Sequence, residues 1–243
     1  MGNAVDGGAP VLKPLAMNET ARPRRHFGRR KGWKLRARQS GLMKGLLPQL
    51  LFAPELGRAP REYFDAPVHD VWLEIGFGGG EHLAAQARAN PDIGIIGAEP
   101  FVAGTAKLLG KIEETGARNI RLYTEDARDI LDALPKASLS RVFILFPDPW
   151  PKTRHHKRRI VQMETLNELA RVMKSGAELR FASDDKSYVS WALERFMAHD
   201  AFGWTAVRAA DWRTRPGDWF ETRYEAKAIR AGRRCTYLRL RRQ

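Results

Sequence analysis

Residues 71–80 are Val71-Trp72-Leu73-Glu74-Ile75-Gly76-Phe77-Gly78-Gly79-Gly80. A short apolar run that ends in glycines predicts a buried β-strand followed by a tight turn, in which the backbone can approach a ligand closely. A dinucleotide-binding G-x-G-x-x-G turn counted from Gly76 requires a glycine at position 81, where this chain has Glu81. The Glu81 carboxylate would repel a pyrophosphate, so the turn disfavours a nicotinamide dinucleotide. The pattern is instead acidic-x-Gly-x-Gly-x-Gly, formed by Glu74, Gly76, Gly78 and Gly80.

Short apolar runs alternate with helical patterns on the C-terminal side of this turn. Strands are predicted at 71–75, 93–98, 119–123, 141–146 and 178–182, and helices at 81–89, 101–114, 127–133, 160–173 and 186–199. A last strand at 235–240 is expected to be antiparallel or at an edge. The alternation predicts an α/β fold with a mostly parallel central sheet, helices on both faces and a final antiparallel strand.

The acidic-glycine turn resembles the first motif of the class I, Rossmann-like methyltransferases. Their cofactor, S-adenosyl-L-methionine, has no phosphate and carries a sulfonium and an ammonium group, which carboxylates suit electrostatically. Two further acids follow predicted strands: Glu99 closes the second strand, and Asp126 follows the third. Ligands sit at the carboxyl ends of the strands in such sheets. Glu99 is therefore expected to accept hydrogen bonds from both ribose hydroxyls. Asp126 and the backbone of Ala127 are expected to contact the adenine.

The fourth predicted strand runs into Pro147-Asp148-Pro149-Trp150. Two prolines restrict the backbone around Asp148 and lower the entropic cost of positioning its carboxylate. Amino-methylating enzymes place a D/N-P-P-Y/F/W motif after this strand, whereas this chain has Asp-Pro-Trp. Trp150 is either a platform on which a base stacks or a buried residue of a tight turn.

A basic run follows at once, from Lys152 to Arg159, with five formal positive charges over eight residues. Phosphate binding is the simplest interpretation, and a solvated charged face is the alternative. The run abuts the rigid aspartate, which favours phosphate binding. His155 and His156 lack the cysteine or acidic partners that a metal site needs, so no metal is expected.

Residues 146–159 together resemble the signature of bacterial tRNA (guanine-N7)-methyltransferases, in which Pro-Asp-Pro-Trp precedes Lys, Arg-His and Lys-Arg-Arg. The resemblance extends over roughly residues 68–240 and includes Ser183-Asp184 and Thr222-Arg223-Tyr224-Glu225. Two departures occur. Pro151 stands where many members have histidine, so no catalytic role is assigned to position 151. Thr-Arg-Tyr-Glu stands where many members have Thr-Lys-Phe-Glu.

The resemblance implies methyl transfer from S-adenosyl-L-methionine to N7 of a guanosine in the tRNA variable loop, usually position 46. It makes Asp148 the candidate catalytic residue. The cofactor-binding residues that we expect are Glu74, Gly76, Gly78, Glu99, Asp126, Ala127 and Asp148. The tRNA-binding residues that we expect are Lys152, Arg154, His155, Lys157, Arg158, Arg159, Asp184, Thr222, Arg223, Tyr224 and Glu225. Within this set, Glu225 is expected to accept hydrogen bonds from the guanine N1 and amino groups.

Charge points to the same class of partner. The 243 residues include 42 lysines and arginines against 28 aspartates and glutamates, a net charge of +14, which favours a polyanion such as tRNA. Residues 21–38 carry nine of the basic residues and no acid. We expect residues 1–40 to be a flexible basic arm that helps to capture RNA, and residues 41–243 to be one methyltransferase domain.

Other features bound the compartment. The single cysteine, Cys235, excludes an internal disulfide framework. No signal peptide is visible, and apolar runs such as 142–146 are too short to cross a bilayer. A soluble cytoplasmic protein is expected, and its oligomeric state is left open. Two alternative functions also remain: methylation of another base atom, such as an exocyclic amine, and a non-catalytic RNA-binding module with a Rossmann-like core.

Overall fold

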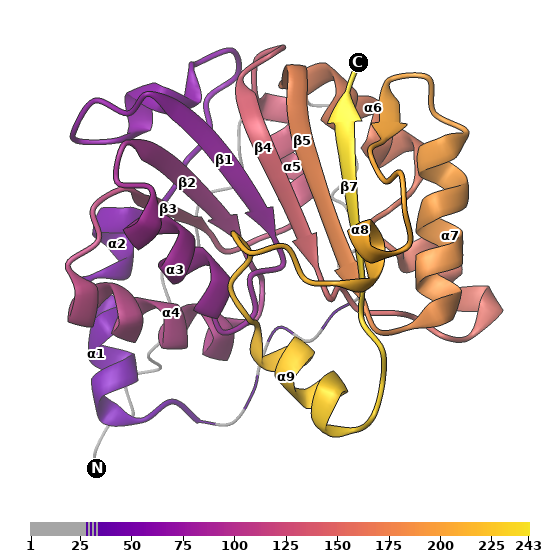
Figure 1. Cartoon of the computed structure of the whole chain (residues 1–243). Coiled ribbons are helices and arrows are strands. Elements are labelled where there is room, and N and C mark those ends of the chain that lie inside the picture. Colours follow the sequence, from indigo (N-terminus) through magenta and orange to yellow (C-terminus); the bar gives the residue numbers. More distant parts are fainter. Residues whose placement is uncertain (1–27, 29, 31, 33) are drawn as a thin grey trace.

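The computed structural model describes residues 28, 30, 32 and 34–243, so most of the predicted basic arm lies outside the described residues (Figure 1). A central sheet organises this part of the chain. Its strands are β1 (Asp70–Ile75), β2 (Ile93–Ala98), β3 (Ile120–Tyr123), β4 (Leu139–Leu145), β5 (Met173–Ser183), β6 (Phe202–Trp204) and β7 (Thr236–Arg242).

The strand order is β3-β2-β1-β4-β5-β7-β6. Strands β1 to β5 are parallel to their neighbours, and β7 pairs antiparallel with both β5 and β6. The predicted parallel sheet with a final antiparallel strand is confirmed. That last strand lies inside the sheet, and the edge is formed by β6, which at three residues is too short to show a pattern in the sequence. The chain reverses its direction of travel across the sheet between β1 and β4, which makes a crevice at their carboxyl ends.

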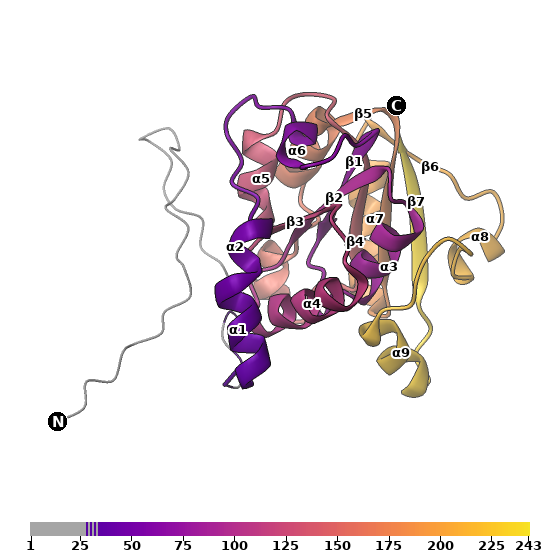
Figure 2. The ribbon, with the colours of Figure 1, turned by 90° about the vertical axis from the view of Figure 1, so that its left-hand side faces the viewer.

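Helices cover both faces of the sheet, as predicted (Figure 2). They are α1 (Ala37–Gly45), α2 (Leu47–Leu50), α3 (Glu81–Ala89), α4 (Val102–Thr115), α5 (Ala127–Ala133), α6 (Met163–Val172), α7 (Lys186–Met197), α8 (Ala210–Arg213) and α9 (Arg223–Arg230), with 3-10 turns η1 (Pro60–Tyr63) and η2 (Thr153–Arg158). Side chains alternate along the strands, so Leu73 enters the core under α5, α6 and α7, while Trp72 enters the core under α1 to α4.

Two boundaries differ from the predictions. The helix expected at 160–173 begins only at Met163, because its N-cap Gln162 has an extended backbone and Val161 is fully buried in the core. At the N-terminus, α1 begins at Ala37 and packs on α4, and Arg38 forms an ion pair with Glu113. The domain boundary proposed at residue 40 therefore lies inside α1. Across the described residues, the helices are too short or too polar to cross a membrane.

Candidate active site

A pocket of about 830 Å³ lies at the carboxyl ends of the parallel strands, at the β1–β4 crevice. Its lining includes all the predicted cofactor-binding residues except Glu74: Gly76, Gly78, Glu99, Asp126, Ala127 and Asp148. Four of the predicted tRNA-binding residues line it too: Arg158, Arg159, Arg223 and Tyr224. Segments that are far apart in the sequence thus meet in one place, because the parallel strands all end at the same edge of the sheet.

The glycine turn after β1 has a backbone that side chains rarely allow. Gly76, Gly78 and Gly80 have φ values of 76°, 56° and 72°, which are favourable only for glycine. Gly104, in the first turn of α4, contributes a further close approach, because a Cβ there would lie 2.2 Å from the Gly78 carbonyl oxygen. Gly104 was not among the predicted site residues. The signal was a glycine near the start of a helix that follows an acidic strand end.

Glu99 ties the glycine turn to the start of α4. Its Oε2 accepts a hydrogen bond from the Gly78 N–H at 2.8 Å, and its Oε1 accepts one from the Phe101 N–H at 2.9 Å. Burial raises the pKa of the Glu99 carboxyl, the two backbone donors oppose that shift, and the nearby Asp148 carboxylate adds to it. The side chain is therefore placed in the pocket with both oxygens oriented by backbone donors.

Asp126 lies at the N-cap of α5. Its carboxylate accepts hydrogen bonds from the Arg128 N–H at 3.0 Å and from the Arg128 Nε at 2.9 Å. Ala127 is the first residue of α5, where the N–H has no acceptor within the helix. An acceptor on a ligand in the pocket would satisfy that donor. Arg128 also lines the pocket and was not predicted, because nothing in its spacing distinguishes it from a surface arginine.

Glu74 is the exception among the predicted cofactor residues. Its side chain is on the opposite face of β1 from Ile75, which lines the pocket. Glu74 is 2% exposed, and its Oε2 lies 2.7 Å from Nδ1 of His82. The carboxylate is therefore paired inside the protein, and the placement does not favour a direct contact with the cofactor.

The loop that carries Asp148 is bounded by two unusual residues. Phe146 and Trp150 have φ values of 51° and 44°, a region that costs non-glycine residues about 1–3 kcal/mol and that is often found at functional sites. Trp150 is partly exposed and lines the pocket, so it is not a buried turn residue. The Arg158 guanidinium lies 4.9 Å from the Trp150 ring centroid. Asp148 and Trp150 are thus both held at the pocket by a constrained backbone.

Arg159 supports this loop from the inside. It is 2% exposed, its Nε donates to the Pro149 carbonyl at 2.9 Å, and its Nη2 donates to Ser187 Oγ at 3.1 Å. The guanidinium also lies 4.8 Å from the Tyr188 ring centroid. A side chain so enclosed is poorly placed to contact RNA phosphates, which was its predicted role. Its contacts indicate instead that it positions the Asp148 loop.

The other cations of the basic run point outward. Lys152, Arg154 and Lys157 are exposed and do not line the pocket. His155 packs edge-on against Trp150, with ring centroids 5.9 Å apart. Its pKa is lowered, first by desolvation and then by Arg158, Arg154 and the neighbouring lysines. His155 is therefore mostly neutral at pH 7, and the charge of this surface comes from its lysines and arginines.

The segment Thr222–Glu225 forms the start of α9, and its residues also separate into some that face the protein interior and some that face the pocket. Thr222 is the N-cap, and its Oγ1 accepts from the Glu225 N–H at 3.1 Å. The Glu225 carboxylate is 2% exposed and accepts from Tyr237 OH at 2.5 Å and from Arg215 at 3.3 Å, so it faces β7 rather than the pocket. Tyr224 is 41% exposed, and its ring packs over Gly78.

Some predicted residues thus remain away from the pocket lining. They are Glu74, Lys152, Arg154, His155, Lys157, Asp184, Thr222 and Glu225. Asp184 forms an ion pair with Arg233. Among the described residues, no cluster of three or more His, Cys, Asp or Glu side chains forms a metal site.

The chain is similar to known methyltransferases. Residues 68–238 match the protein family described as "Putative methyltransferase". A tRNA (guanine-N(7)-)-methyltransferase of Rhodospirillum rubrum is 54% identical over 224 residues, which cover 90% of this chain and 88% of that protein. The protein of the same name from Rhizobium meliloti is 52% identical over 219 residues, which cover 89% of this chain and 94% of that protein.

The fold also matches a solved structure. The crystal structure of the 16S rRNA methyltransferase KamB superposes with a TM-score of 0.54 at 18% identity, covering 75% of this chain and 91% of KamB. At that identity the match shows a shared class I methyltransferase fold. The family follows from the sequence relatives, which match at about half of all positions over nearly the whole chain. The chain belongs to the tRNA (guanine-N(7)-)-methyltransferase family.

Proposed function

We propose that this protein transfers a methyl group from S-adenosyl-L-methionine to N7 of a guanosine in tRNA, in the variable loop and usually at position 46. The observation that carries the proposal is the 54% identity to a tRNA (guanine-N(7)-)-methyltransferase over 90% of the chain. The pocket supports it, because Asp148 and Trp150 lie beside the glycine turn in one lining.

The glycine turn and the carboxylates of the pocket suit the cofactor. A Cβ at Gly104 would collide with the Gly78 backbone, so the turn and α4 meet closely along one wall. Three carboxylates of the lining, Glu99, Asp126 and Asp148, suit the cationic groups of the cofactor, while the lysines and arginines of the same lining suit the phosphates of the tRNA. Glu99 is oriented to accept hydrogen bonds from the ribose hydroxyls, and Asp126 with the Ala127 N–H to contact the adenine. When bound, S-adenosyl-L-methionine supplies an electrophilic methyl group on a sulfonium.

The reaction requires little proton transfer. Guanine N7 has an available lone pair and no proton to lose, so a strong general base is unnecessary. The residues must align the base with the methyl group and stabilise the positive charge that develops on the purine. Asp148 supplies a fixed carboxylate for that charge. Trp150 and Tyr224 offer aromatic faces on which the base can stack.

The outer part of the site binds RNA. Lys152, Arg154 and Lys157 are exposed cations next to the Asp148 loop and are suited to contact phosphates. Asp184, Thr222 and Glu225 act by holding α9 and the nearby chain in place. The basic segment at residues 21–38, which falls mostly outside the described residues, adds electrostatic capture. The proposed substrate is found in the cytoplasm, which is where we place the protein.

The test uses tritiated cofactor and bulk tRNA, followed by nuclease digestion, nucleoside mass spectrometry and mapping of the modified position. We expect 7-methylguanosine in the variable loop. Methylation of an exocyclic amine instead would favour a different RNA methyltransferase. Failure of the protein to bind the cofactor in a direct titration would favour a non-catalytic RNA-binding module. Transfer only to DNA or protein would overturn the proposal.

A further inference from the structure

Helix α9 lies beyond the carboxyl ends of β1 and β4 (Figure 1), and its first residues line the pocket. Arg223 and Tyr224, its first two residues, line the pocket together with Arg158 and Arg159 from the basic run. The rest of α9 leads away from the pocket toward solvent. Any strand of RNA that delivers a base past Tyr224 therefore passes near this helix.

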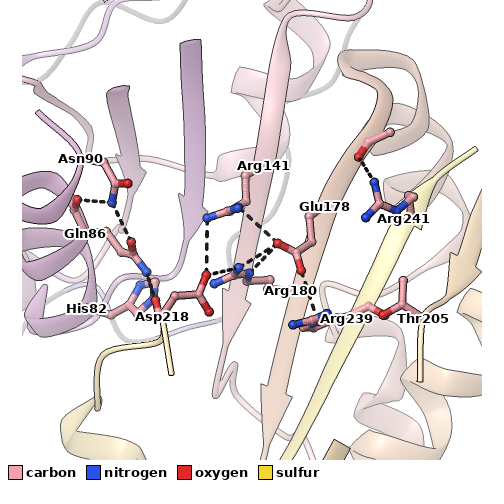
Figure 3. A network of polar contacts seen from close by, with 11 residues as sticks. His82, Gln86, Asn90, Arg141, Glu178, Arg180, Thr205, Asp218, Arg239 and Arg241 are labelled. Carbon is pink, nitrogen blue, oxygen red and sulfur yellow. Dashed lines mark hydrogen bonds and ion pairs between the residues drawn. The ribbon is translucent and has the colours of Figure 1, made fainter. Parts of the chain in front are cut away.

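The inner side of α9 is firmly anchored. Glu225 is held by Tyr237 and Arg215, and Trp219, just before the helix, is buried. Asp218 is held from two sides: its carbonyl accepts from Gln86 Nε2 at 2.8 Å, and its carboxylate pairs with Arg180 (Figure 3). The orientation of the helix is thus set by contacts with β5, β7 and α3. A surface on its outer side would be preorganised rather than formed on binding.

The outer side of α9 carries a stripe of cations, Arg223, Lys227 and Arg230. Their spacing of four and three residues places them on one face of the helix, opposite the buried Glu225 and Ala228. Lys227 and Arg230 are exposed, and among the described residues neither has an acidic partner. Like charges at these spacings repel one another, so the stripe is unfavourable until an anion lies against it.

We propose that this stripe is a second RNA-binding surface of the enzyme, which contacts phosphates of the tRNA strand flanking the target guanosine. Arg223 of the stripe lines the pocket together with Arg158, which belongs to the basic run that carries the exposed Lys152, Arg154 and Lys157. The two basic surfaces flank the pocket, so a strand bound to both holds its base over the opening. The inference rests on the proposed function, because it assumes a tRNA substrate.

Cations in the last turn of a helix also compensate the helix dipole. That role predicts an effect on folding stability alone, whereas phosphate binding predicts an effect on tRNA affinity and its salt dependence. The test therefore needs a control variant that carries the same change in charge at exposed cations away from the pocket. Arg88, in the last turn of α3, and Arg118 are exposed and lie beside a separate hollow, lined by Phe64 and Pro91.

The experiment compares Lys227→Glu/Arg230→Glu with Arg88→Glu/Arg118→Glu in the full chain. The tRNA Kd is measured over a series of salt concentrations, and cofactor binding and thermal unfolding are measured as controls. In the α9 variant, the slope of log K against log salt should flatten by about 1.4–1.8, since each phosphate contact contributes about 0.7–0.9. The Kd near 0.1 M salt should rise at least about tenfold. The control variant should keep the wild-type slope, and both variants should keep cofactor affinity.

Equal slopes for the two variants would overturn the inference and leave only a general effect of net charge. A fall in thermal stability of the α9 variant with unchanged tRNA affinity would assign the stripe to the helix dipole. If the charge reversal prevents folding, Lys227→Gln/Arg230→Gln answers the same question with half the change in charge. Failure of the proposed function is distinguished by the wild type, which would then yield no 7-methylguanosine in the same preparation.

Discussion

Two parts of the site differ in how well the sequence predicted them: the floor, formed by the strand ends and the glycine turn, and the rim, formed by the basic run and the start of α9. On the floor, Gly76, Gly78, Glu99 and Asp126 lie where strand ends and turns were predicted to place them. At the rim, residues of one motif separate. Arg154 is exposed while Arg159 is buried, and Tyr224 faces the pocket while Glu225 faces β7. The position of a floor residue follows from the backbone of the strand or turn that carries it. The position of a rim residue depends on the side chains against which it packs.

Removal of Asp148 should have the largest effect on catalysis, because its carboxylate is proposed to stabilise the charge that develops on the purine. In Asp148→Ala we expect kcat to fall by about 10²- to 10³-fold, the usual effect of removing one preorganised electrostatic group. The cofactor Kd should change much less. Single-turnover methylation and isothermal titration measure the two quantities. Unchanged turnover would remove Asp148 from its proposed role.

Arg159 and Arg154 test whether charge or position matters at the rim. Arg159→Met leaves the Pro149 carbonyl without its donor, and we expect kcat to fall by up to about 10²-fold through misplacement of Asp148. The salt slope of tRNA binding should stay at the wild-type value. Arg159→Lys should restore part of the rate only if the charge near Tyr188 matters as well as the forked geometry.

Arg154→Met is the matched exposed change. It should leave kcat at saturating tRNA near the wild-type value and reduce the salt slope by about one. The two variants should therefore differ in which parameter changes. If Arg159→Met alters the salt slope as much as Arg154→Met does, the division of the basic run into inner and outer residues is wrong.

Gly104→Ala should disturb the glycine turn that lines the pocket. The new Cβ would lie 2.2 Å from the Gly78 carbonyl, so α4 or the turn must shift, and overpacking of this kind costs about 1–3 kcal/mol of stability. We expect weaker cofactor binding and a lower Tm. Gly110→Ala, in the same helix with open space at its Cβ position, should instead stabilise the protein by about 0.5–1 kcal/mol.

We expect the mildest effect at Glu99, where the affinity for the cofactor should depend on pH. Burial raises the pKa of Glu99 above its ordinary value of 4.5. Cofactor affinity should therefore be complete above this raised pKa and should decline as the pH falls through it, because a protonated carboxyl accepts hydrogen bonds poorly.

The raised pKa of Glu99 affects folding stability in the opposite direction from cofactor affinity. Because the pKa in the folded state exceeds the ordinary value, the ionised Glu99 destabilises the cofactor-free protein at neutral pH, and this effect disappears below pH 4.5. Glu99→Gln should bind the cofactor more weakly with a flatter pH profile, because it does not ionise and its single amide oxygen can accept from only one of the Gly78 and Phe101 N–H groups. A wild-type pH profile for this variant would show that another group titrates.

The sequence by itself determined the alternation of strands and helices, the glycine turn and the acids at the ends of β2 and β3. These features are local: a strand alternates its side chains, a positive φ requires glycine, and parallel strands end at one edge. The edge strand β6 and the short helix α8 escaped prediction because three and four residues are too few to show a period. The helix α1 was not predicted, because it is stabilised by α4, which lies far along the chain.

Only the tertiary structure decided which polar residues face the pocket. Glu74 pairs with His82 across the strand–helix junction, Arg159 with Ser187, and Glu225 with Tyr237. Each pairing depends on how separate elements pack, and a buried charge must find such a partner because burying it alone is too costly. A motif specifies which residues are present, and packing specifies which of them remain exposed to bind a ligand.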